Sequence, residues 1–151
     1  MKDAKYDLEE RLLEFAVRVM HVTESMSRSR AGAHVADQLL RPGTSPYGHH
    51  GEAEGAESRD DFVHKLKVCY KELRESRRWL RLVHRTPLVA KPERLSGILN
   101  EADEHVRIFA ASIRTAESNR PQPRLNLSVK RSALNVERLA PQMARASRES
   151  R

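Results

Sequence analysis

Apolar residues recur at alternating steps of four and three residues in three separate segments of this 151-residue chain. A mean step of about 3.5 residues keeps them on one face of an α-helix, and another helix has to cover that face. The spacing therefore predicts an all-α helical bundle. The three series are Leu8, Leu12, Phe15, Val19, Val22 and Met26; Phe62, Leu66, Cys69, Leu73, Ser76, Leu80 and Val83, with Ser76 as the one polar member; and Leu95, Leu99, Ala102, Val106, Phe109, Ile113 and Ala116.

Helix start and stop signals bracket each of these segments. Asp7 and Ser58 are suitable N-cap residues, and each has an acidic residue three positions later. Pro92 suits the first turn of a helix, where its missing N–H costs nothing. We expect the three helices to span about residues 8–26, 59–85 and 92–118.

Residues 31–57 allow two interpretations. Residues 31–41 have a helical pattern, but residues 42–51 contain two prolines and three glycines, which favours a loop. Three amphipathic helices, however, would leave one flank of the core uncovered. A fourth, kinked helix through this region would complete an antiparallel up-down four-helix bundle, so helix and loop both stay open.

Composition indicates one globular domain followed by a basic tail. The chain is 38% hydrophobic and 32% charged, and it has no apolar run long enough to span a membrane. Residues 1–118 are expected to form the bundle, while residues 119–151 carry eight Lys or Arg against two Glu and are expected to be a mostly disordered basic C-terminal tail. Because the N-terminus lacks an apolar signal stretch and Cys69 is a single thiol within the apolar series, we expect a cytoplasmic protein with a buried, unreactive cysteine.

Two sequence blocks resemble a known family. Residues 36–45 read ADQLLRPGTS and residues 58–67 read SRDDFVHKLK, with LRES and WLRL further along. Over about residues 6–118 the chain resembles the bacterial four helix bundle protein family, also called the 23S rRNA intervening-sequence protein family. The resemblance implies a helical second segment and a homopentamer of antiparallel four-helix protomers. It implies no established enzyme activity, and distant relatives are accessory proteins of diversity-generating retroelements that are held to bind nucleic acid and a reverse transcriptase. Pro42 and Pro46 depart from the family's commoner residues and leave the straightness of the second helix open.

A basic stripe is the main functional signal. Heptad assignment of the second apolar series places six cationic residues at consecutive outward b and f positions. The stripe is about 27 Å long at 1.5 Å per residue, which suits a phosphate backbone. The alternative is an ordinary solvated face whose field is reduced by neighbouring Glu72 and Glu75. The candidate nucleic-acid-binding residues are Lys67, Lys71, Arg74, Arg78, Arg81 and Arg85.

No motif predicts catalysis, a metal or another cofactor. His49 and His50, with Glu52 and Glu54 nearby, are the nearest approach to a metal cluster, but adjacent histidines on a helix point about 100° apart. The Glu-x-x-His motif of di-metal bundles, the Gly-x-Ser-x-Gly elbow and the P-loop are all absent from the sequence. We therefore expect a non-enzymatic protein without cofactors.

Two functions from different classes remain. The first is a homo-oligomeric scaffold or adaptor, because apolar residues outside the heptad series need a partner. The second is an accessory protein that binds nucleic acid (RNA) through the stripe and the tail, with a nucleic-acid-processing protein as a further partner and no membrane. The apolar residues outside the series are Leu13, Ala16, Met20, Val63, Val68, Tyr70, Trp79 and Leu82.

Overall fold

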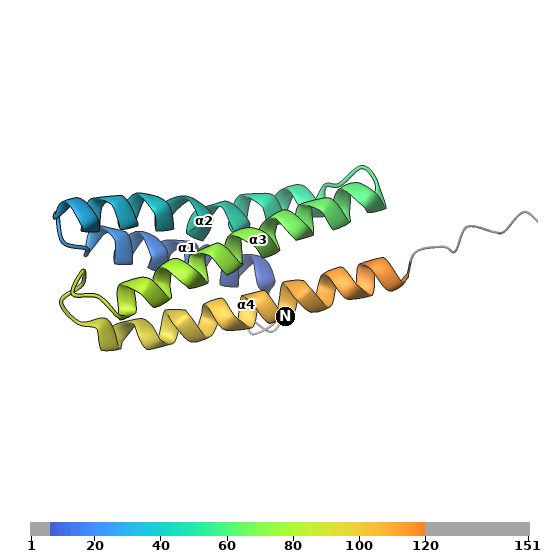
Figure 1. Ribbon diagram of the computed structural model, residues 1–151. Coiled ribbons are helices and arrows are strands. Elements are labelled where there is room, and N and C mark those ends of the chain that lie inside the picture. The colour runs from blue at the N-terminus through green and yellow to red at the C-terminus, as the bar shows by residue number, and fades with distance from the viewer. Residues whose placement is uncertain (1–6, 120–151) are drawn as a thin grey trace, which may run out of the picture. The chain divides into compact units, whose positions relative to one another are not determined.

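The computed structural model describes residues 7–119, and within them the chain forms an antiparallel up-down bundle of four α-helices without β-strands (Figure 1). A short 3-10 helix, η2, precedes the last α-helix. Residues 120–151 lie outside the described residues, so the expected disorder of the tail stays a prediction. The elements are α1 (Leu8–Glu24), α2 (Arg30–Glu54), α3 (Arg59–His84), η2 (Pro92–Leu95) and α4 (Ser96–Ser118).

The predicted helix starts are confirmed. The Asp7 carboxylate accepts a hydrogen bond from Glu10 N at 3.2 Å, and the Ser58 hydroxyl accepts one from Asp61 N at 3.1 Å. Pro92 opens η2, which leads directly into α4. These side chains occupy amide groups that a helix start leaves without a partner, so both helices begin where the sequence places them.

Helix α2 continues through both prolines, so the loop interpretation of residues 42–51 is wrong. Pro42, Gly43 and Pro46 are buried, and this part of α2 lies directly against α1. A Cβ atom on Gly43 would lie 2.5 Å from Val19 Cγ1, so only glycine allows this close approach. Tertiary packing therefore outweighs the local propensity for a loop.

The apolar series predicted from the sequence form the core. Every member is buried or half-buried, and Ser76, the polar one, donates a hydrogen bond to Glu72 O within its own helix at 2.9 Å. The helices pack in the order α1–α2–α3–α4, with α4 returning to α1, so α1 and α3 occupy opposite corners. Two residues expected to need a partner, Ala16 and Val63, are 7% and 5% exposed and belong to the protomer's own interior. That part of the prediction is wrong, because the buried face of each helix is wider than the heptad seam.

Helix α1 is the shortest of the four and begins part-way along α4 (Figure 1). Its Arg11 forms ion pairs with Glu101 and Glu104 of α4, which fixes that register. At the end where α1 meets α2, Ser27 N donates to Leu88 O at 2.8 Å and joins the α1–α2 turn to the α3–α4 connection. Within residues 7–119 no helix is long and apolar enough to cross a membrane.

Candidate functional site

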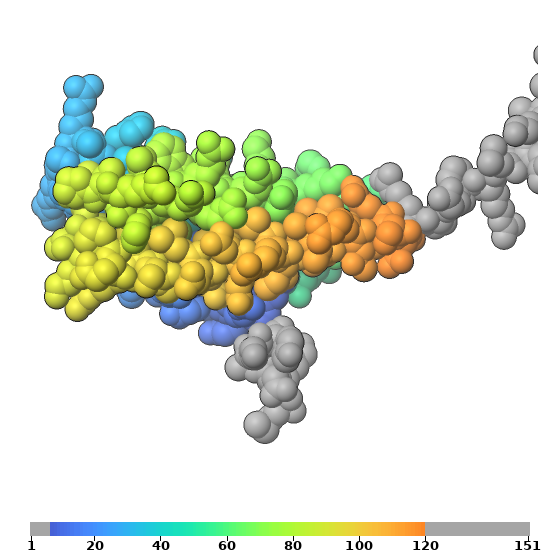
Figure 2. All heavy atoms as spheres, turned by 60° about the horizontal axis from the view of Figure 1, so that its bottom comes forward, coloured from blue at the N-terminus to red at the C-terminus, as the bar shows by residue number. Residues whose placement is uncertain are grey.

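The six predicted nucleic-acid-binding residues are all exposed. Figure 2 shows the side of the bundle on which α3 and α4 lie next to each other along their length. Each stripe residue, from Lys67 near the start of α3 to Arg85 at its C-cap, projects away from the core. The structure therefore brings these residues together on one helix as predicted.

Among residues 7–119, neither Glu72 nor Glu75 forms an ion pair within 4.0 Å with a stripe residue. Glu72 is buried and faces α2, and Glu75 accepts a 3.5 Å hydrogen bond from Trp79 Nε1. Lys67 pairs instead with Glu117 of α4 at 2.6 Å. Glu72 thus faces away from the stripe, whereas Glu75 stays beside Lys71, Arg74 and Arg78.

A hollow of about 630 Å³ opens on α3 between the stripe residues. Its apolar surface comes from Tyr70, Trp79 and Leu82, the last 42% exposed, and the Arg74 guanidinium lies 5.5 Å from the centre of the Tyr70 ring. Tyr70 and Trp79 are half-buried and also pack against the core. The surface of α3 therefore combines exposed cations with an aromatic and aliphatic patch.

A second set of exposed apolar side chains lies on α1 and α2. Met20 is 50% exposed, Leu40 39% and Tyr47 37%. Leu40 and Tyr47 are seven residues apart and share one side of α2. Since α1 and α3 occupy opposite corners of the bundle, Met20 and the hollow on α3 lie on different sides of the protomer.

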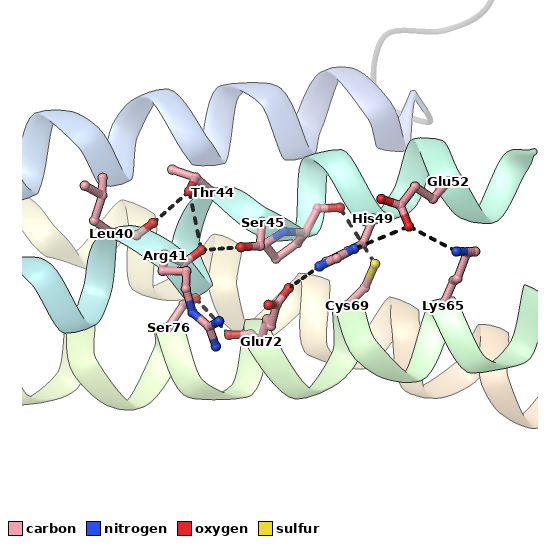
Figure 3. Close-up of polar contacts among 11 residues, drawn as sticks. Leu40, Arg41, Thr44, Ser45, His49, Glu52, Lys65, Cys69, Glu72 and Ser76 are labelled. Atoms are coloured by element: carbon pink, nitrogen blue, oxygen red, sulfur yellow. Dashed lines mark hydrogen bonds and ion pairs between the residues drawn. The ribbon is translucent and has the colours of Figure 1, made fainter.

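Polar side chains also join α2 to α3 across the region of the two prolines (Figure 3). His49 Nδ1 lies 3.7 Å from Glu52 Oε2, and His49 Nε2 lies 3.6 Å from Glu72 Oε2. Lys65 Nζ approaches the same Glu52 oxygen at 3.0 Å. His50 points elsewhere and packs edge-on against Phe109. The two adjacent histidines therefore diverge as predicted, and residues 7–119 hold no group of three His, Cys, Asp or Glu side chains placed to bind a metal.

Burial controls the ionisation of two groups in this contact. It raises the pKa of the Glu72 carboxyl, and the nearby His49 and Arg41 only partly oppose that shift. Burial also raises the pKa of the Cys69 thiol to about 12, and Cys69 Sγ lies 3.7 Å from Pro46 O. A thiol held protonated in this way is a poor nucleophile, which agrees with the structural role predicted for Cys69.

His105 is a buried polar residue that the sequence pattern does not identify. It has no exposed surface, packs edge-on against Phe15 and lies 3.0 Å from Glu101 Oε1, yet neither ring nitrogen makes a well-directed hydrogen bond. Burial lowers its pKa to about 4, although the Glu101 carboxylate favours the charged form. His105 adjoins the heptad series at Val106, and its burial depends on the register of α1, which the sequence spacing leaves unspecified.

Comparisons with known proteins agree with this architecture. The sequence profile described as "23S rRNA-intervening sequence protein" matches residues 5–111. A solved structure from Bacteroides thetaiotaomicron, a protein of unknown function from the S23 ribosomal protein family, is 33% identical, with a TM-score of 0.63. That similarity covers 70% of this chain and 96% of the other. No curated protein matches the chain.

Proposed function

The chain belongs to the 23S rRNA-intervening sequence protein family, and on that premise we propose that it is a non-enzymatic homo-oligomeric scaffold of the cytoplasm, most simply a closed pentamer. The observation that carries the proposal is apolar surface left uncovered on two different sides of the protomer. Met20, Leu40 and Tyr47 form one set, and Tyr70, Trp79 and Leu82 form the other.

The positions of the two sets favour a ring. An isologous contact uses the same patch on both copies, whereas two different patches favour a heterologous contact in which one copy's α3 packs on α1 and α2 of the next. Repetition of such a contact by rotation closes a ring and covers both patches on every copy. The pentameric number comes from the resemblance to the family.

The test is the mass of the full chain by light scattering at micromolar concentration. Two substitutions each add a charge to one apolar set, Leu82→Glu on α3 and Met20→Glu on α1, and each is expected to give a helical monomer. The control is Asn100→Glu at an exposed position of α4, which is expected to keep the wild-type mass. Each of the first two variants retains one intact patch, so mixing them should form a heterodimer. A wild-type monomer contradicts the scaffold, and two monomers that stay separate on mixing contradict the heterologous contact.

Nucleic-acid binding is the second candidate, supported by the exposure of all six stripe residues and by the burial of Glu72 against α2. Phosphate contact is the natural use of long exposed cationic side chains, so binding is expected to be indifferent to sequence. RNA that copurifies with the protein, raises its absorbance at 260 nm and is released by high salt would support this function. Protein free of nucleic acid at low salt, with no affinity for added RNA, would exclude it.

A further inference from the structure

Positive and negative side chains are separated along the bundle, although the net charge of the described residues is zero. Residues 7–119 contain 18 Lys or Arg and 18 Asp or Glu. Residues 18–34 and 77–97 together hold nine Lys or Arg against two acids, a net +7, so the rest of residues 7–119 carries −7. We call these two segments the basic end.

The up-down topology brings the two segments of the basic end together. The α1–α2 turn and the α3–α4 connection lie at the same end of the bundle, opposite the end at which α4 finishes (Figures 1 and 2). The hydrogen bond from Ser27 N to Leu88 O joins them directly. Two helices begin and two finish at this end, so their dipoles largely cancel and the field comes from side chains.

The cations of the basic end have few partners within the protomer. Arg77 pairs with Asp103 at 3.0 Å, and among residues 7–119 no ion pair within 4.0 Å engages the other eight. A hollow of about 420 Å³ lies between the end of α1 and η2, where His21, Ser25, Lys91 and Arg94 add polar groups to an apolar floor. Arg28 of the adjoining turn is exposed.

We propose that the basic end is the surface on which the protein docks the phosphate backbone of RNA, with Arg28, Lys91 and Arg94 among its contacts. This inference rests on the nucleic-acid-binding candidate and moves its site from the length of the α3 stripe to one end of the bundle. Eight of the nine cations are arginines, whose planar guanidinium matches phosphate geometry. An acidic protein partner is the less favoured occupant, because the centres of protein interfaces are depleted in charge.

The experiment compares two triple variants of the full chain, so the tail is the same in both. Arg28→Gln, Lys91→Gln and Arg94→Gln remove three cations from the basic end outside the stripe. Lys67→Gln, Lys71→Gln and Arg74→Gln remove three from the stripe outside the basic end, and all six residues are exposed. Fluorescence anisotropy measures binding of a labelled RNA duplex of about 20 base pairs over a salt series, since each phosphate contact adds about −0.9 to the slope of log affinity against log salt. Circular dichroism and mass confirm that both variants fold and assemble.

We expect the basic-end variant to lose about tenfold or more in affinity and its salt slope to fall in magnitude by about 3, while the stripe variant stays close to wild type. Equal losses, or a larger loss in the stripe variant, would overturn the basic end but leave RNA binding intact. A wild-type chain that ignores the duplex would overturn both. Binding of polyglutamate in preference to the duplex would assign the basic end to an acidic protein instead.

Discussion

Gly43 shows how one residue governs the contact between α1 and α2. An added methyl group would meet the Val19 side chain, whereas Gly48, in the same helix, has no atom within 4 Å of the corresponding position. We expect Gly43→Ala to destabilise the fold by about 1–2 kcal/mol, because an overpacking cost of about 1–3 kcal/mol exceeds the gain in helix propensity of about 1 kcal/mol. Urea denaturation followed by circular dichroism measures this change.

Gly48→Ala is the matched control for that variant. It gains the same helix propensity without the clash, so it is expected to stabilise the chain by about 0.5–1 kcal/mol. If both substitutions stabilised the protein equally, the close approach of α1 and α2 at Gly43 would be wrong.

His105 makes stability depend on pH. Its pKa is about 4 in the folded chain against 6.5 for the unperturbed group, so the unfolded state binds the proton more readily. Stability is therefore lost as pH falls from about 6.5 towards 4, and this contribution is fully present above that window. We expect His105→Leu to remain folded at pH 7 and to lose less stability between pH 7 and pH 5 than wild type does, as measured by urea midpoints. An identical pH dependence in both proteins would show that His105 does not control it.

The element that the sequence leaves undecided is α2, and the reason is physical. The apolar spacing of the other three helices repeats over many residues, so it identifies them and their buried faces, Ser76 included. In α2, Pro42, Gly43 and Pro46 are buried, and local propensity disfavours a helix at those same positions. The contacts that stabilise α2 as a helix come from α1 and α3, so its own sequence does not indicate it. Only the family resemblance and the need for a fourth helix to cover the core do so.

The start of α3 offers a test at the scale of one element, since α3 carries both the stripe and a large share of the core. Ser58→Ala removes the acceptor of the Asp61 N–H, and loss of such a cap typically costs about 1 kcal/mol. Ser118→Ala, at the C-terminal end of α4, removes only an exposed hydroxyl that donates to Thr115 O and should leave stability nearly unchanged. Thermal unfolding compares the two, and equal melting temperatures would show that Ser58 contributes little to the start of α3.

For the whole molecule, counting charge along the sequence conceals the polarity that the fold creates. The stripe can be found from heptad positions, because its residues belong to one helix. The basic end joins segments about 60 residues apart, so it emerges only after the helices are placed antiparallel. The predicted up-down topology is enough to locate the basic end once the charges are added up separately for each end of the bundle. The burial of Glu72, in contrast, can be seen only in the structure.

Residues 119–151 are expected to contribute charge to the whole chain but nothing to the folding of the bundle. The core residues of the bundle pack among themselves within residues 7–119, so a chain ending at Ser118 is expected to keep its helicity and oligomeric mass. The shortened chain lacks eight Lys or Arg and two Glu, so its net charge is lower by 6. Any affinity for RNA should therefore fall and depend less steeply on salt. Circular dichroism, light scattering and the anisotropy salt series measure the three properties separately. A shortened chain that kept its helicity but became monomeric would place part of the subunit interface in residues 119–151, and an unchanged salt slope would show that residues 119–151 contribute no phosphate contacts.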